Sequence, residues 1–174
     1  WFEVKTKGLN EFQQSELKEQ WGTTQKVLGS LSRLDKVVTD IIGDFNVKPR
    51  LASGRGNAIL VASSIFDACR YYALFQGTEL KGKCAIVTSY NPMTRDVTTE
   101  DIGENTETGK QLIYNTYMKL LEGKSTEKYE DDAKAKFIKE PANMRLLVVV
   151  DKLLVGFDAP PCTYLYIDKS MQDH

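Results

Sequence analysis

The sequence predicts an α/β protein with a mainly parallel sheet, and three observations support this prediction. Short, mainly apolar runs rich in Val, Leu, Ile and Ala recur at 57–62, 84–89 and 146–150. Continuous runs of this length are typical of strands that are buried on both faces. A segment with helical periodicity, 65–76, separates the first two runs, as a crossover between parallel strands requires. Further helical segments precede the first run and lie between the second and the third.

The composition is that of a soluble globular domain. The chain has 174 residues, of which 41% are hydrophobic and 27% charged, and its net charge is −1. Such a charge provides no general attraction to nucleic acid, although a local basic patch suffices for one. Cys69, Cys84 and Cys162 are widely spaced, which favours reduced thiols over a disulfide framework or a zinc site. No apolar run is long enough to cross a membrane and no signal peptide is recognised, so we expect a cytoplasmic protein without membrane contact.

The first 45 residues have the apolar spacing of helices, and we expect them to form a helical lead-in that packs on the domain behind it. Residues 46–56 are expected to be a loop, because they contain one proline, two glycines and three basic residues without an acid. This loop is either a solvated linker or a basic segment that attracts DNA phosphates.

Two serines follow the first strand directly. Ser64 and Asp67, three residues later, make a capping-box pattern, so we expect Ser64 to cap the helix 65–76. A turn from a strand into a helix also attracts anions, through backbone N–H groups and the helix dipole. Ser63 and Ser64 are therefore either structural residues or phosphate contacts. The core face of the helix is predicted to comprise Ile65, Ala68, Cys69, Tyr72 and Phe75.

The segment 91–140 is interpreted as an insertion. Its first part, 92–110, is polar and acidic, and we expect a long loop there. Helical periodicity follows at 111–122, and Ser125 or Thr126 is expected to cap a last helix that runs to about residue 140. The outer face of that helix is expected to be solvated and joined by i,i+4 ion pairs. That face carries Glu127, Glu130, Asp131, Asp132, Lys134 and Lys136.

The most informative stretch follows the strand at 146–150. It contains Asp151, Lys152 and the turn Gly156-Phe157-Asp158-Ala159-Pro160, and it ends in a second strand at 163–167 and Asp168. Ligands of open α/β sheets bind at the carboxyl ends of the strands, so a functional site is expected here. The alternative is structural, with Asp151 capping a short helix and Asp158 bracing the turn.

These residues carry a resemblance to a known family. The stretch DKLLVGFDAPPCTYLYIDKSMQDH (151–174) resembles the second motor domain of the restriction (R) subunit of type I restriction-modification enzymes, which are DNA translocases of helicase superfamily 2. The resemblance is close over 145–174 and looser over 57–90. It implies a three-layer RecA-like domain at 46–174, preceded by the helical segment 1–45 and ending before the family's final arginine motif.

The resemblance also implies roles for individual residues. ATP lies between two RecA-like domains in such motors, and by the match Gly156 and Asp158 belong to the ATP cleft, with Asp158 near the ribose. Asp151 and Lys152 are implied to couple this cleft to the DNA. The residues implied to contact the DNA backbone are Ser63, Ser64 and Ser89. Val150 departs from the family pattern, since many such motors have Thr there, and Val offers no hydroxyl to a phosphate.

The implied protein is the ATP-dependent translocase and endonuclease subunit of a type I restriction enzyme. Its implied partners are double-stranded DNA, the methylase and specificity subunits, and the first motor and nuclease domains of the same chain. Its implied cofactors are ATP and Mg²⁺.

The sequence has no GxxxxGK[ST] loop and no carboxylate pair for Mg²⁺. We therefore expect an inactive piece of a longer protein that has no catalytic or metal-binding residue and binds no cofactor alone. One alternative is a non-catalytic α/β interaction or regulatory module. A complete Rossmann-like enzyme is disfavoured, because the glycines of LASGRGN precede the first strand and do not follow it.

Overall fold

A computed structural model of the protein describes residues 31–92, 106–150 and 156–169. The chain divides into two compact units, Trp1–Thr39 and Asp40–His174. In the first unit the described residues, 31–39, are helical, and the helix continues to residue 47 in the second unit. The predicted boundaries, 1–45 and 46–174, stay predictions.

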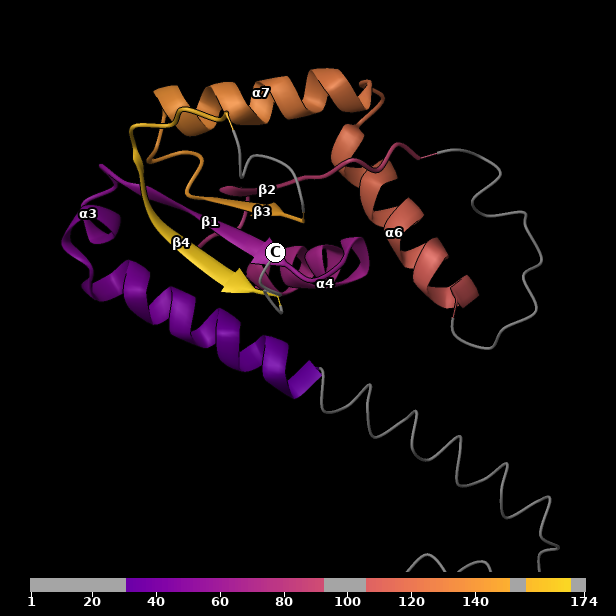
Figure 1. Ribbon diagram of the computed structural model, residues 1–174, viewed down its shortest axis with the longest axis horizontal. Coiled ribbons are helices and arrows are strands. Elements are labelled where there is room, and N and C mark those ends of the chain that lie inside the picture. Colours follow the sequence, from indigo (N-terminus) through magenta and orange to yellow (C-terminus); the bar gives the residue numbers. More distant parts are fainter. Residues whose placement is uncertain (1–30, 93–105, 151–155, 170–174) are drawn as a thin grey trace, which may run out of the picture. The chain divides into compact units, whose positions relative to one another are not determined.

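Four strands of the second unit form one sheet in which every pair of neighbours is parallel (Figure 1). The order across the sheet is β2-β3-β1-β4. The strands are β1 (Asn57–Ala62), β2 (Cys84–Val87), β3 (Leu146–Val149) and β4 (Cys162–Asp168). Every residue of β1, β2 and β3 is buried, as the continuous apolar runs predicted. The predicted α/β class with a parallel sheet is therefore confirmed.

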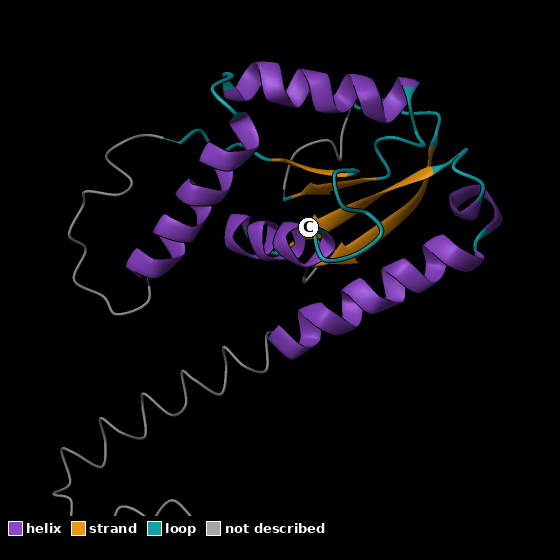
Figure 2. Ribbon diagram, turned by 180° about the vertical axis from the view of Figure 1, so that it is seen from behind, coloured by secondary structure: helices purple, strands orange, loops and turns teal. Residues whose placement is uncertain are grey.

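Helices cover both faces of the sheet (Figures 1 and 2). On one face α7 (Thr126–Lys139) buries Ala133 and Phe137 against Ile59, Val61 and other apolar residues of β1, β2 and β3. On the other face α4 (Ile65–Phe75) packs on the same three strands, and α6 (Thr106–Leu121) packs on α4. This is the three-layer arrangement of a RecA-like domain. None of the described helices has the length and apolar character that a membrane span needs.

The two predicted helix caps are confirmed. The Ser64 hydroxyl accepts a hydrogen bond from the Asp67 N–H at 3.1 Å, and α4 begins at the next residue. The Ser125 hydroxyl accepts one from the Lys128 N–H at 3.2 Å at the start of α7. Each serine satisfies one N–H group that the first helical turn leaves without an intrahelical partner.

Two predicted loops contain helix. Residues 46–56 include one helical turn, α3 (Pro49–Ala52), because a proline suits the first position of a helix. The helix α6 begins at Thr106, within the predicted loop 92–110. The residues of that loop from 93 to 105 lie outside the described part of the chain.

The outer face of α7 needs one correction. Glu130 was assigned to this solvated face, but only 5% of it is exposed. It lies three residues before Ala133 and seven before Phe137, so the helical repeat turns it toward the core. An i,i+4 ion pair does lie on the outer face, between Lys128 and Asp132 at 3.0 Å.

The helix that ends at residue 47 packs on β4 and on the start of β3 through its second-unit residues. Ile41 and Phe45 are buried. The Tyr166 hydroxyl, from β4, donates a hydrogen bond to Asp44 Oδ2 at 3.0 Å. The Arg145 guanidinium, just before β3, lies 4.8 Å from the centre of the Phe45 ring. Burial of this guanidinium lowers the pKa of Arg145.

Candidate functional site

The carboxyl ends of β1 and β2 bring polar residues to one edge of the sheet. Val61 of β1 and Val87 of β2 both pair with Val149 of β3. Ser63 lies two residues after Val61, and Ser89 lies two residues after Val87. Both serines therefore lie the same number of residues beyond the row of paired residues that contains Val149. Because β3 lies between the two strands, their ends are about 10 Å apart.

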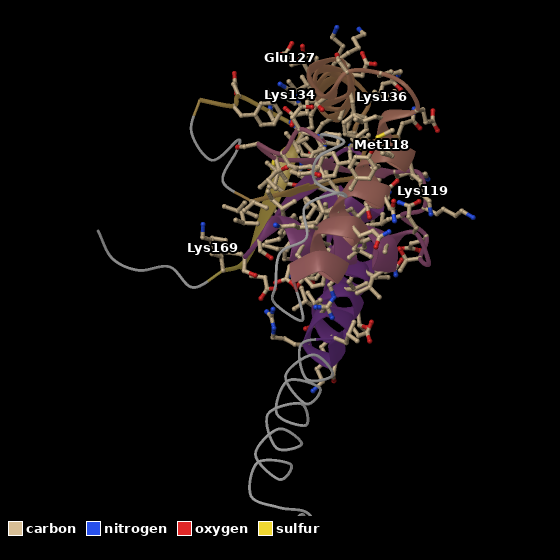
Figure 3. All side chains as sticks on the ribbon, turned by 90° about the vertical axis from the view of Figure 1, so that its right-hand side faces the viewer. Met118, Lys119, Glu127, Lys134, Lys136 and Lys169 are labelled. Atoms are coloured by element: carbon tan, nitrogen blue, oxygen red, sulfur yellow. The ribbon has the colours of Figure 1, made fainter. Side chains whose placement is uncertain are left out.

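The end of β4 extends this edge on the other side of β1. Asp168 pairs with Ala62, the residue immediately before Ser63. Lys169 follows Asp168, and Figure 3 shows its side chain well apart from the labelled lysines of α6 and α7. The described residues at this edge therefore follow the order Ser89, Ser63 and Lys169 across the sheet.

The turn between β1 and α4 holds its two serines differently. Ser64 is part of the helix cap, whereas Ser63 is exposed. The Ser63 hydroxyl donates a hydrogen bond to Asp67 Oδ2 at 2.6 Å. The other carboxylate oxygen of Asp67 lies 3.6 Å from the Arg70 guanidinium. An exposed hydroxyl and a guanidinium thus meet one carboxylate at the positive end of the helix dipole.

Ser89 is exposed and follows a residue that is firmly held. The Thr88 side chain is buried, and its hydroxyl is hydrogen-bonded to the Tyr117 hydroxyl at 2.5 Å. The Tyr90 N–H donates to the same Thr88 oxygen at 3.1 Å, and the ring of Tyr90 meets that of Tyr117 edge-on. Burial raises the pKa of Tyr117, so its hydroxyl stays protonated. Thr88 and Tyr117 were not predicted from the sequence to support Ser89.

Gly156 and Asp158 lie in the segment that returns from the end of β3 to the start of β4. Gly156 has a φ of +76°, a conformation that favours glycine. Asp158 is exposed and makes no hydrogen bond or ion pair with the described residues. Between them, Phe157 packs against Phe137 of α7 with ring centres 6.1 Å apart, which anchors the segment on the core.

The predicted site residues fall into two groups in the structure. Ser63, Ser64 and Ser89 share the carboxyl edge of the sheet. No contact joins Gly156 or Asp158 to these serines among the described residues. Asp151 and Lys152, the predicted coupling residues, follow β3 between the two groups in sequence but lie outside the described residues.

The described side chains offer little for chemistry of their own. Burial raises the pKa of both Cys69 and Cys84 to about 12, so these thiols are neutral. None of the three cysteines is in a disulfide. Residues 31–92, 106–150 and 156–169 contain no group of three or more His, Cys, Asp or Glu side chains that could hold a metal ion.

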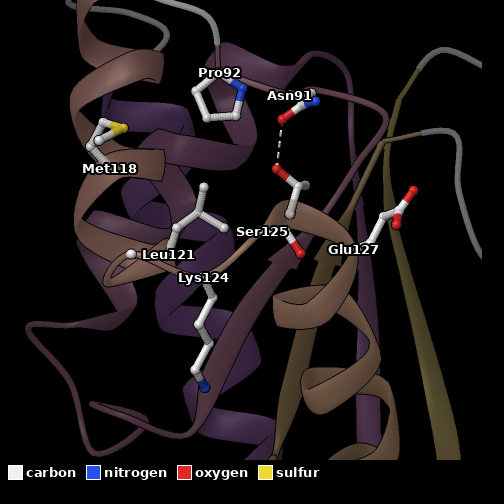
Figure 4. A pocket seen from close by; sticks show the side chains of 9 residues that line it. Asn91, Pro92, Met118, Leu121, Lys124, Ser125 and Glu127 are labelled. Atoms are coloured by element: carbon white, nitrogen blue, oxygen red, sulfur yellow. Dashed lines mark hydrogen bonds between the residues drawn. The ribbon is translucent and has the colours of Figure 1, made fainter.

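A cavity of about 530 Å³ lies beside the α6–α7 turn (Figure 4). Two of its lining residues are joined by a hydrogen bond, which the Thr126 hydroxyl donates to Asn91 Oδ1 at 2.9 Å. The charged residues of the lining are Lys124 and Glu127, one of each sign, so the cavity favours neither an anion nor a cation.

One contact at the carboxyl edge was not predicted from the sequence. Tyr72 was predicted for the core face of α4, but Tyr71 is the tyrosine with no exposed surface. Its hydroxyl donates a hydrogen bond to Asp168 Oδ2 at 2.5 Å. The spacing of Tyr71 from Ala68 (three residues) and Phe75 (four residues) could have indicated this, because such residues share one helix face.

Comparison with known proteins agrees with this architecture. Residues 54–174 match the family described as "Type I restriction enzyme subunit R domain 3". The chain is 28% identical over 159 residues to a protein of Methanocaldococcus jannaschii named "Putative type I restriction enzyme MjaIXP endonuclease subunit". That alignment covers 91% of this chain and 13% of the relative, so the chain spans about one eighth of the relative's length. The chain therefore belongs to the family of type I restriction enzyme subunit R domain 3.

Proposed function

We propose that this chain is part of the second motor domain of an ATP-dependent DNA translocase and endonuclease subunit, and that the carboxyl edge of its sheet contacts the DNA backbone. The observation that carries this proposal is the exposed Ser63 hydroxyl beside the helix cap of Ser64, at the start of α4. Hydroxyl groups and helix N-termini are common ligands of DNA phosphates. Such contacts are independent of base sequence, which suits a protein that moves along DNA.

The shared level of the strand ends supports the same proposal. Ser89 and Ser63 lie beyond the ends of β2 and β1 at matching positions, and Lys169 follows the end of β4. A row of hydroxyls with a cation at one side can follow a phosphate backbone. Methylase and specificity subunits, and a nuclease and a first motor domain in the same chain, are the proposed partners.

The proposed ATP cleft involves Gly156 and Asp158. Asp158 is an exposed carboxylate without a partner among the described residues, so its oxygens fit a hydroxyl donor such as a ribose. The sequence has no GxxxxGK[ST] motif of the kind that forms a phosphate-binding loop. We therefore place the residues that bind the phosphates and Mg²⁺ on the first motor domain. ATP supplies the free energy for movement, while Asp158 orients the ribose when the two motor domains close.

Replacement of Ser63 tests the DNA contact. In the full-length subunit, we expect Ser63→Ala to raise the duplex DNA concentration that gives half-maximal ATPase stimulation by about three- to tenfold, the loss of one net hydrogen bond. The dependence of DNA binding on salt should stay the same, because no charge is removed. Steady-state ATPase titrations and fluorescence anisotropy at several salt concentrations measure both quantities.

Ser53→Ala is the matched control. Ser53 is also exposed, and its hydroxyl also makes a local hydrogen bond, to the Arg50 carbonyl oxygen at 3.2 Å. It lies before β1, at the opposite edge of the sheet, so its replacement should leave DNA stimulation unchanged. Equal effects of the two variants would contradict the proposed contact. A wild-type subunit without DNA-stimulated ATPase would favour a non-catalytic interaction module.

Replacement of Asp67 should have the opposite effect. A phosphate that approaches Ser63 must compete with the Asp67 carboxylate, which already accepts the Ser63 hydroxyl. We expect Asp67→Asn to tighten DNA binding about fivefold, because two unit charges 4 Å apart repel by about 1 kcal/mol in water. Asp131→Asn, on the exposed face of α7, should change affinity little. Fluorescence anisotropy measures the DNA affinity of both variants. Weaker DNA binding by Asp67→Asn would argue against a phosphate contact at this turn.

A further inference from the structure

The hydrogen bond between Tyr71 and Asp168 joins two elements that meet at the proposed DNA contact. Tyr71 has no exposed surface, so its hydroxyl has little access to water and depends on partners within the protein. Its hydroxyl donates to Asp168 Oδ2 at 2.5 Å, across 97 positions of sequence. A charge-assisted bond of this kind, between a buried phenol and a carboxylate, is both strong and directional.

The location of Asp168 relates this bond to the β1–α4 turn. Through its backbone Asp168 pairs with Ala62, the last residue of β1. Through its side chain it holds Tyr71, two turns into α4. Ser63 and Ser64 lie between Ala62 and the helix. One residue of β4 therefore fixes both the strand that enters the turn and the helix that leaves it.

We propose that Tyr71 and Asp168 are positioning residues for the Ser63–Ser64 turn: they hold the start of α4 at the angle at which these serines meet a DNA phosphate. This inference rests on the proposed function. Tyr71 is enclosed in the core and does not reach the ligand. Asp168 is an acid, so a direct contact with phosphate would be repulsive. Their effect on DNA is exerted through the turn.

A second tyrosine–aspartate bond on the same strand provides the control. Tyr166, two residues before Asp168, donates to Asp44 at 3.0 Å. The helix that contains Asp44 carries none of the proposed site residues. Tyr71→Phe and Tyr166→Phe each remove one hydroxyl and keep the ring. Both variants should lower the melting temperature of the full-length subunit, Tyr71→Phe at least as much because Tyr71 is the more deeply buried, while only Tyr71→Phe should affect the response to DNA.

The experiment measures ATPase stimulation of the full-length subunit by duplex DNA. We expect Tyr71→Phe and Asp168→Ala each to raise the half-stimulating DNA concentration roughly fivefold, a typical change in coupling for one contact. The maximal rate at saturating DNA should stay within about twofold of wild type, since the proposed ATP contact at Asp158 is untouched. The double variant should be less damaging than the sum of the two single variants, because the two residues share one bond.

Asp168→Asn distinguishes a role of Asp168 in positioning the turn from a direct effect of its negative charge on DNA binding. Asparagine keeps an oxygen that accepts the Tyr71 hydroxyl, so it should restore a response close to wild type. If Asp168 acted only through its negative charge, Asp168→Ala and Asp168→Asn would both tighten DNA binding, and the inference would be wrong. The inference would also be wrong if Tyr71→Phe and Tyr166→Phe had the same half-stimulating DNA concentration. Failure of the wild-type subunit to respond to DNA would instead overturn the proposed function, and this inference with it.

Discussion

Phe137→Ala should lower the free energy of unfolding by about 3–5 kcal/mol, the usual cost of removing a fully buried aromatic ring. Phe137 has no exposed surface. It fills the space between α7 and the sheet, where it contacts the apolar residues of β1, β2 and β3 and also Phe157. A cavity left at this place cannot close without movement of the helix. Urea denaturation followed by circular dichroism measures the change.

This replacement should also affect the segment that carries Asp158. Phe157 packs on Phe137, and the residues on either side of it are exposed. Loss of the Phe137 ring therefore removes an anchor of this segment, and we expect faster amide hydrogen exchange there. Lys136→Ala is the control, because Lys136 is the exposed neighbour on the same helix and alanine keeps the helix propensity. Similar destabilisation by the two replacements would refute the assigned role of Phe137 in the core.

The layers of the fold were predictable because the sequence is locally consistent. The apolar runs that became β1, β2 and β3 can be buried only in a sheet with two covered faces. The serines before α4 and α7 both act as caps. Glu130 was misplaced because polarity alone suggested a solvated position, whereas the helical repeat places it beside Ala133 and Phe137. A charge pattern is weaker evidence of exposure than the angle around the helix.

The candidate site was predictable only in part. Ser63 and Ser64 could be found because a strand directly precedes a capping pattern. The matching positions of Ser63 and Ser89 beyond their strands depend on how β1 and β2 pair with β3. This strand register is not encoded locally. The contact between Tyr71 and Asp168 spans 97 residues and requires the full strand order. Long-range contacts of this kind become visible only when the sheet is assembled.

Asp158→Ala in the full-length subunit should reduce kcat/KM for ATP, measured with saturating DNA, by about ten- to hundredfold. This range corresponds to the loss of one hydrogen bond to a charged group, about 1.5–3 kcal/mol. The change in stability should stay within about 0.5 kcal/mol, because Asp158 is exposed and has no partner among the described residues. Coupled-enzyme ATPase assays and thermal melting measure the two quantities.

Two further variants separate a ribose contact from a general loss of charge. Asp158→Asn keeps an acceptor oxygen in the same place, so its kcat/KM should lie between those of the wild type and Asp158→Ala. Asp131→Ala removes an aspartate whose side chain is 71% exposed on α7, far in sequence from the segment 156–161, and should leave ATPase unchanged. An Asp158→Ala subunit with wild-type kcat/KM would exclude the ribose contact. The DNA contact at Ser63 would be unaffected by that result, since no described contact links the two places.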